Sequence, residues 1–142
     1  METEFEVLLI EDDMVDVLGF TRALRKSSDP VNLHVVAQGE EAFQFLEKKE
    51  GRGLPNLIVL DLNMPIMGGL EFLGALKSDP ALRQIPVVVM TTSSERKDIE
   101  RSYDLGAAGY MVKPLDHEEF VTKVKRLHDY WKSCEKPDFK IV

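Results

Sequence analysis

Five short runs of Val, Ile and Leu alternate along the chain with segments of helical period, and this alternation restricts the fold more than any other feature. Two of the runs, at 57–60 and 87–90, are apolar at every position, as in strands of a parallel sheet that helices cover on both faces. The pattern therefore predicts a three-layer α/β fold around one five-stranded parallel sheet, with right-handed crossovers. The predicted strands are residues 5–10, 31–37, 57–60, 87–90 and 110–112.

Apolar residues between the predicted strands recur at spacings of three and four, which places each set on one face of a helix. We expect five successive strand–helix units in a single domain, because 142 residues is the size of one ordinary globular domain. The apolar sets are Val17, Phe20 and Leu24; Ala42, Phe43 and Leu46; Leu70, Leu73, Ala75 and Leu76; and Phe120, Val124, Leu127 and Trp131.

The end of the chain continues past the last helical pattern. We assign residues 1–132 to the domain and residues 133–142 to a C-terminal tail. The tail contains Phe139, Ile141 and Val142, which are compatible either with a frayed end or with a docking strand.

The charge balance and the lack of a long apolar run narrow the partners and the location. With 25 acidic and 18 basic residues the formal charge is −7, which disfavours a broad grip on nucleic acid, so we expect no DNA binding by this chain. No apolar run approaches the roughly 20 residues of a membrane span, and the acidic N-terminus is unlike a secretory signal. The single cysteine, Cys134, fits a reducing compartment. These features predict a cytoplasmic protein without membrane contact.

Four of the predicted strands run directly into side chains that are suited to phosphate or metal chemistry. Because the carboxyl ends of parallel strands meet at one edge of the sheet, where ligands of open α/β sheets bind, we expect these side chains to converge. They are Glu11, Asp12 and Asp13 after the first strand, Asp61 after the third, Thr91 and Thr92 after the fourth, and Lys113 after the fifth.

Converging carboxylates repel one another unless a cation neutralises them. Oxygen ligands without a nearby His or Cys suit Mg²⁺. A lysine and a threonine hydroxyl in the same crevice can contact phosphoryl oxygens. The set therefore predicts a site where a phosphoryl group is transferred onto an aspartate.

Each of these residues also has an ordinary structural explanation. Asp13 fits the N-cap of the next helix, Lys113–Pro114 fits a plain turn, and Thr91 and Thr92 fit the start of another helix. All of them in register at one edge of a sheet favour the site over these separate explanations.

In order and spacing, these residues resemble the CheY-like receiver domain of two-component response regulators over about residues 5–130. Each motif is weak alone, but the ordered set is specific. The resemblance implies a flavodoxin-like (βα)5 fold with strand order 2-1-3-4-5 and a phosphoacceptor signalling domain rather than an enzyme. The motifs are Leu-Ile-Glu11-Asp12-Asp13, Val-Leu-Asp61-Leu-Asn63-Met64-Pro65, Met90-Thr91 and Gly109-Tyr110-Met111-Val112-Lys113-Pro114.

The resemblance also implies a role for each matched position. Asp61 is expected to accept the phosphoryl group beside Mg²⁺, with Asp12 as a direct metal ligand and Glu11 as a ligand acting through water. The backbone carbonyl of Asn63 is expected to complete the metal site.

The remaining matched residues are implied to contact the phosphoryl group and to carry the switch. Lys113 and Thr91 are expected to contact that group, and the Lys113–Pro114 peptide bond is expected to be cis. When Thr91 moves toward the phosphoryl group, Tyr110 is expected to turn inward, although a Tyr110 hydroxyl left in solvent is the alternative. One departure is Gly68–Gly69, which stands where an Asp-Gly pair is common and removes a helix cap.

The long connection at 78–86 and the hydroxyl-rich 91–93 segment resemble the stand-alone regulators that accompany bacterial phytochromes. Expected partners are a sensor histidine kinase or a phosphotransfer protein and an unknown downstream protein. With so little chain after the last helix, no output domain is expected. A homodimer through Trp131, Phe139 and Ile141 is a further candidate, unless these side chains pack on their own domain.

Other functions compete with this interpretation. A dehalogenase-type phosphatase would need an Asp-x-Asp at the first strand, which here ends in Glu11-Asp12-Asp13. A flavodoxin-like FMN carrier would be repelled by the same carboxylates. A phosphate sink, a phosphorelay shuttle and a phosphorylation-independent binding module remain as alternatives within the receiver family.

Overall fold

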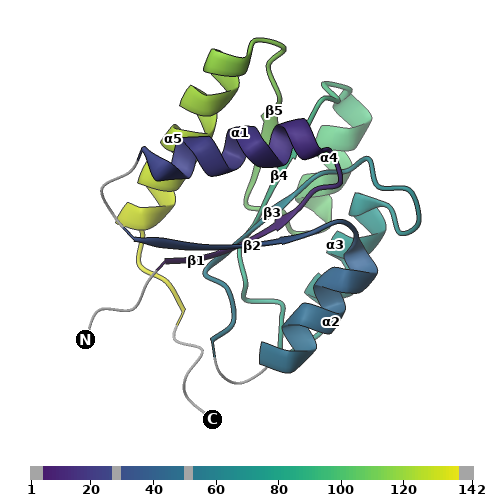
Figure 1. Cartoon of the computed structure of the whole chain (residues 1–142). Helices are drawn as coiled ribbons and strands as arrows, with labels where there is room; N and C mark the ends of the chain where they lie inside the picture. Colours follow the sequence, from purple (N-terminus) through teal and green to yellow (C-terminus); the bar gives the residue numbers. More distant parts are fainter. Residues whose placement is uncertain (1–4, 27–29, 50–52, 138–142) are drawn as a thin grey trace.

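The computed structural model describes residues 5–26, 30–49 and 53–137, in which strands and helices alternate (Figure 1). The strands are β1 (Phe5–Ile10), β2 (Val31–Val36), β3 (Leu57–Leu60), β4 (Val87–Thr91) and β5 (Gly109–Val112). The helices are α1 (Met14–Arg25), α2 (Gly39–Lys49), α3 (Gly69–Ser78), α4 (Arg96–Asp104) and α5 (His117–Ser133). The predicted strand positions are confirmed to within one residue at either end.

The sheet is parallel throughout, with the order β2-β1-β3-β4-β5. Figure 1 shows α1 and α5 on one face of it and α2, α3 and α4 on the other. This arrangement confirms the three-layer, flavodoxin-like α/β fold. Because every strand runs in the same direction, the carboxyl ends of all five lie along one edge.

The two inner strands explain why both faces of the sheet are covered. All residues of β3 and β4 are buried. Along β3, Ile58 and Leu60 pack with the helices α2 and α3, whereas Leu57 and Val59 pack with α1 and α5. Burying such a side chain contributes about 1.5–3 kcal/mol, so the continuously apolar strands require helices on both sides.

Helix α4 is packed differently from the other helices. Among its residues only Ser102 is buried, and its hydroxyl donates to the Asp98 carbonyl within the same helix. Few buried apolar contacts hold α4 in place, which is typical of an element that can move at low cost.

The connection after α3 is ordered by a lysine and by buried apolar residues. Lys77 Nζ donates to the carbonyls of Arg83 (2.8 Å) and Ile85 (2.7 Å), while Leu82 and Ile85 are buried. Gly106 lies over the Lys77 side chain with a φ of +106°, a conformation that favours glycine. This segment is therefore part of the folded domain.

The last described residues follow α5. Trp131 is half-buried and packs against the core between the sheet, α1 and α5. It therefore packs at least in part on its own domain, and its use in a homodimer stays a prediction. Phe139, Ile141 and Val142 lie outside the described residues. None of the helices in the described ranges is long and apolar enough to cross a membrane.

Candidate functional site

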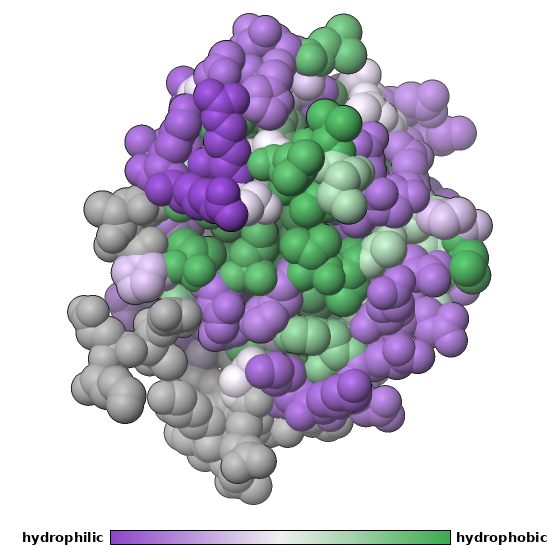
Figure 2. All heavy atoms as spheres, in the orientation of Figure 1, coloured by the Kyte–Doolittle hydropathy of each residue, from purple (hydrophilic) through white to green (hydrophobic). Residues whose placement is uncertain are grey.

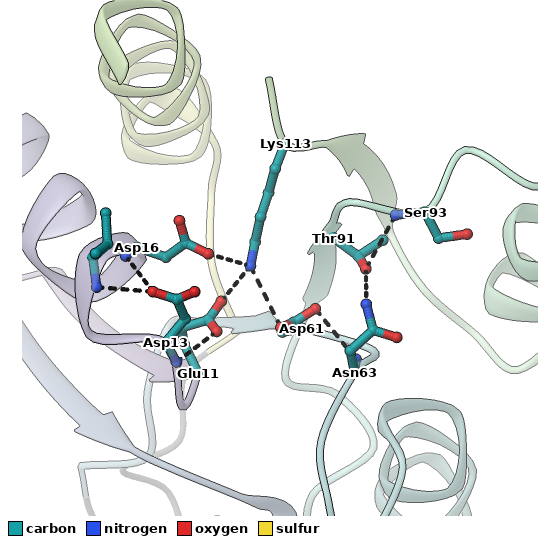
Figure 3. Close-up of polar contacts among 9 residues, drawn as sticks. Glu11, Asp13, Asp16, Asp61, Asn63, Thr91, Ser93 and Lys113 are labelled. Carbon is teal, nitrogen blue, oxygen red and sulfur yellow. Dashed lines mark hydrogen bonds and ion pairs between the residues drawn. The ribbon is translucent and has the colours of Figure 1, made fainter. Parts of the chain in front are cut away.

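The carboxyl edge of the sheet brings together residues from four strand ends. Glu11 follows β1, Asp61 follows β3, Thr91 ends β4 and Lys113 follows β5. Figure 3 shows the Lys113 side chain reaching from β5 toward Glu11 and Asp61, with Thr91 beyond Asp61. Glu11 and Asp61 are only 4% and 5% exposed, and Thr91 is fully buried. The predicted convergence is confirmed.

Three carboxylates form a cluster that fits a metal ion. Glu11, Asp12 and Asp61 each offer an oxygen, and these oxygens lie within 4.8 Å of one another. The pKa of Glu11 is raised to about 7, chiefly by burial and in part by the charge of Asp61, although hydrogen bonds from Lys113 and from the Asp13 amide oppose the shift. Hard oxygen donors that repel one another are the ligand set that a divalent cation such as Mg²⁺ stabilises.

The raised pKa of Glu11 predicts a pH-dependent stability in the absence of divalent metal. Between the ordinary value of 4.5 and about 7, the folded state binds more protons than the unfolded state, so stability should fall as pH rises through this window. The loss should amount to at most about 3 kcal/mol. Urea unfolding in EDTA between pH 5 and pH 8 measures it, with Glu11→Gln as the control. If Glu11→Gln loses as much stability between pH 5 and pH 8 as the parent does, Glu11 is not the source of the pH dependence.

Lys113 lies among three carboxylates. Its Nζ is 2.6 Å from Glu11 Oε1, 2.7 Å from Asp16 Oδ2 and 3.4 Å from Asp61 Oδ2. Burial by itself would lower the pKa of Lys113, but the hydrogen bonds to Asp16 and Glu11 and the charge of Asp61 outweigh burial and raise it. The ammonium is therefore charged and neutralises part of the acidic cluster.

The expected cis peptide bond before Pro114 is wrong, because the described chain contains no cis peptide bond. The trans form of an X–Pro bond is favoured by about 0.5–1 kcal/mol, and the cis form needs packing to offset that cost. Lys113 nevertheless reaches the site, and its amide donates to the Thr91 carbonyl at 2.7 Å.

Two further acids follow the first strand and act differently. Asp13 caps α1, since its side chain accepts from the amides of Val15 and Asp16, as the structural explanation predicts. Asp16 was missed by the sequence analysis, although its carboxylate contacts Lys113. An acid in the first turn of a helix is ordinarily explained by the helix dipole, so spacing alone gives no reason to place Asp16 in the site.

The loop after β3 folds tightly behind the phosphoacceptor candidate. The Asn63 amide donates to Asp61 Oδ1 at 3.3 Å. A side chain at Gly69 would come within 2.6 Å of Leu62 Cα and 2.7 Å of the Asp61 carbonyl, so only glycine allows this approach. Gly68, at the N-cap of α3, makes no side-chain cap, as expected from its sequence.

A chain of hydrogen bonds leads from the site to α4. Thr91 Oγ1 accepts from Asn63 Nδ2 (3.3 Å) and from the Ser93 amide (3.5 Å) (Figure 3). The hydroxyl of Ser93 donates to Asp98 of α4 at 2.6 Å, and the Tyr110 hydroxyl donates to the Ser93 carbonyl at 2.9 Å. The Tyr110 hydroxyl is thus engaged by the loop before α4, against the alternative that left it in solvent.

Apolar side chains are exposed on α1 and in the loops that follow β3 and β5. Figure 2 shows apolar residues gathered over α1 and β2. Met14, Val15 and Leu18 of α1 are 62–68% exposed, and Ile66 and Leu115, in the loops after β3 and β5, are 72% and fully exposed. So much apolar surface beside a polar site is typical of protein contact.

Comparison with protein families gives a match to the response regulator receiver domain over residues 7–125. Among curated proteins, the probable methanogenesis regulatory protein FilR2 of Methanothrix harundinacea is 34% identical, over 92% of this chain and 85% of its own length. The response regulator Rcp1 of Synechocystis is also 34% identical, over 88% of this chain and 87% of its own length.

Solved structures give the same result at the level of the fold. The phosphorylated cyanobacterial phytochrome response regulator RcpA superposes with a TM-score of 0.89 at 35% identity, covering 96% of this chain and all of its own. The Mn²⁺-bound form of Rcp1 superposes with a TM-score of 0.87 at 32% identity, covering 94% of this chain and 99% of its own. Both likenesses extend over nearly the whole chain.

Proposed function

Because the chain belongs to the response regulator receiver family, a family of phosphoacceptor modules rather than enzymes, we propose that Asp61 accepts a phosphoryl group from a sensor histidine kinase. The transfer requires Mg²⁺, and it changes a protein-interaction surface. The observation that carries this proposal is the position of Asp61: it is buried, clustered with the two acids Glu11 and Asp12, and 3.4 Å from the ammonium of Lys113.

The geometry suits phosphoryl transfer with little further chemistry. An oxygen of Asp61 forms a bond to phosphorus while the bond from phosphorus to the leaving nitrogen of the phosphohistidine breaks, and the nitrogen keeps the electron pair. Lys113 donates to the transferred oxygens, and Thr91 contributes its hydroxyl. Positioning and charge neutralisation supply most of the rate in such reactions.

Mg²⁺ would be held by Asp12, Asp61, the backbone carbonyl of Asn63 and, through water, Glu11. When bound it neutralises the charge that develops on the phosphoryl oxygens. The Mn²⁺-bound structure of Rcp1 supports a divalent cation in this class of protein.

Asp12→Asn should raise the dissociation constant for Mg²⁺ by about tenfold or more, because it removes one of three clustered carboxylates. Asp13→Asn is a matched control, since it removes the neighbouring charge and retains a good N-cap. Isothermal titration of both variants with Mg²⁺ measures the difference. Equal affinities in the two variants would remove Asp12 from the metal site.

Thr91 and Tyr110 provide the route from the site to α4. The Thr91 hydroxyl accepts hydrogen bonds from Asn63 and from the Ser93 amide. Ser93 also forms hydrogen bonds with Tyr110 and with Asp98 of α4. When Thr91 turns toward a phosphoryl group these bonds must rearrange, and the lightly packed α4 can follow.

Thr91→Ala should still be phosphorylated, but it should lose most of the chemical-shift change that phosphorylation causes at the Ser93 and Tyr110 amides. The reason is that alanine lacks the hydroxyl that joins the two regions. Thr91→Ser restores the hydroxyl and should restore the response. Two-dimensional NMR before and after phosphorylation checks this, and a full response in Thr91→Ala would refute the coupling.

The partner that we favour is a phytochrome-type sensor kinase. RcpA is a cyanobacterial phytochrome response regulator, and this chain resembles it along its full length. The exposed apolar residues of α1 beside the site offer a surface on which a kinase domain can place its phosphohistidine.

The experiment that tests the proposed function is intact-mass spectrometry after incubation with acetyl phosphate and Mg²⁺, with EDTA as the control. We expect one labile phosphoryl adduct that depends on the metal. The same assay with a phosphorylated phytochrome-type kinase tests the partner. No adduct with either donor would leave a phosphorylation-independent binding module as the better description.

A further inference from the structure

The ammonium of Lys113 has two short contacts and one long one. Its Nζ lies 2.6 Å from Glu11 and 2.7 Å from Asp16, but 3.4 Å from Asp61 (Figure 3). An ammonium group has three N–H donors, so two are committed and the third faces the phosphoacceptor. Lys113 is therefore held near Asp61 without forming a tight pair with it.

Asp16 differs from Glu11 because it lies outside the acidic cluster that fits a metal. Glu11 shares that cluster with Asp12 and Asp61, and its second oxygen also accepts from the Asp13 amide. A bound cation would compete with Lys113 for the carboxylate of Glu11. Asp16 stays available to Lys113 whether or not a cation is present.

The position of Asp16 is fixed by the packing of α1. Its amide donates to the capping carboxylate of Asp13, and α1 packs closely against α5, where a side chain at Gly19 would come within 2.9 Å of the Phe120 ring. Phe20 and Phe120 line the apolar side of the narrow pocket around Lys113. The electrostatic attraction between the Asp16 carboxylate and the Lys113 ammonium is strengthened by these apolar side chains, because they lower the local dielectric constant.

We propose that Asp16 is a positioning residue for phosphoryl transfer. It holds the Lys113 ammonium so that the third N–H meets the incoming phosphoryl group, and it keeps the ammonium from neutralising the Asp61 nucleophile beforehand. The inference rests on the proposed function. In the transfer, Asp61 forms the new bond to phosphorus, the leaving group departs with the electron pair of the broken bond, and Lys113 receives the charge on the phosphoryl oxygens. Without Asp16, the ammonium closes the gap to Asp61.

A simple charge effect of Asp16 would have the opposite sign. Removing a carboxylate near the entrance favours the approach of an anionic phosphodonor, and this should raise the rate. Removing an anchor of Lys113 should lower it. The direction of the change therefore separates positioning from general electrostatics.

The test uses the full chain, acetyl phosphate as donor and saturating Mg²⁺, with acid-quenched intact-mass time courses. Asp16→Asn is compared with Asp13→Asn, which removes one charge from the same helix start but no contact to Lys113. We expect Asp16→Asn to lower the maximal rate about tenfold with little change in the half-saturating donor concentration, and Asp13→Asn to stay near the parent. Asp16→Glu should recover part of the loss.

A double-mutant cycle tests whether Asp16 acts through the lysine. In a Lys113→Met background, Asp16→Asn should change the rate no further. A second tenfold fall there, or a rate in Asp16→Asn at or above that of Asp13→Asn, overturns the positioning role while the parent is still phosphorylated. A parent that takes up no phosphoryl group overturns the proposed function and this inference together.

Discussion

Asp61→Asn is expected to abolish the phosphoryl adduct completely while the fold is retained. The amide is nearly the same size as the carboxylate, but it is not a nucleophile toward phosphorus at neutral pH. The fold should be retained, because the substitution removes a negative charge that repels Glu11. That repulsion is one cause of the raised pKa of Glu11. Intact mass after acetyl phosphate treatment measures the adduct, and thermal unfolding in EDTA shows whether the fold is retained.

The matched control is Asp129→Asn, an exposed acid on α5. Its adduct should equal that of the parent, because α5 runs opposite to the strands and residue 129 lies near its end, far from the carboxyl edge. A labile adduct that persists in Asp61→Asn would place the acceptor on another acid of the same edge, and peptide mapping would show whether it is Asp12 or Asp13.

Lys113→Met should destabilise the protein strongly when no divalent metal is present. The side chain of Lys113 is only 7% exposed and contacts Glu11, Asp16 and Asp61. Removing one partner from buried ion pairs costs about 3–5 kcal/mol, because the remaining charges lose their compensation. Urea unfolding at pH 8 in EDTA measures the loss, and phosphorylation should also slow.

Mg²⁺ should restore more stability to Lys113→Met than to the parent, since a cation bound at the acidic cluster replaces part of the missing positive charge. Lys123→Met is the control. Lys123 is half-buried and donates at 2.7 Å to the Val112 carbonyl, so its loss should cost only about 1 kcal/mol and should not depend on Mg²⁺. Equal losses in both variants would contradict the central role of Lys113 in the charge balance.

The helix α4 shows where periodicity alone stops being informative. The other helices have apolar stripes that mark them, such as Phe20 and Leu24 in α1, because each covers part of the sheet. In α4 only Ser102 is buried, so an apolar stripe is missing and the succession of strand–helix units is what predicts a helix there. The weak packing that hides α4 from the pattern is also the property on which its proposed response to phosphorylation depends.

Asp16 and Pro114 show a second limit of prediction from the sequence. Asp16 belongs to the site because α1 begins at Met14 and turns its first residues toward Lys113, a direction that spacing does not reveal. The bond before Pro114 is trans, and the Lys-Pro sequence by itself permits either isomer. The place of Asp16 is decided by a contact between segments 97 residues apart in the chain.

The sequence by itself determined the layered parallel fold, the convergence of the acids, Thr91 and Lys113, and the family, because strand direction alone brings strand ends to one edge. Only the tertiary structure decided how the charges are shared: Lys113 lies closer to Glu11 and Asp16 than to Asp61, and Tyr110 is bonded to the loop before α4. The reason is physical. The order of residues sets which groups meet, whereas packing to within a few tenths of an ångström sets which of them pair.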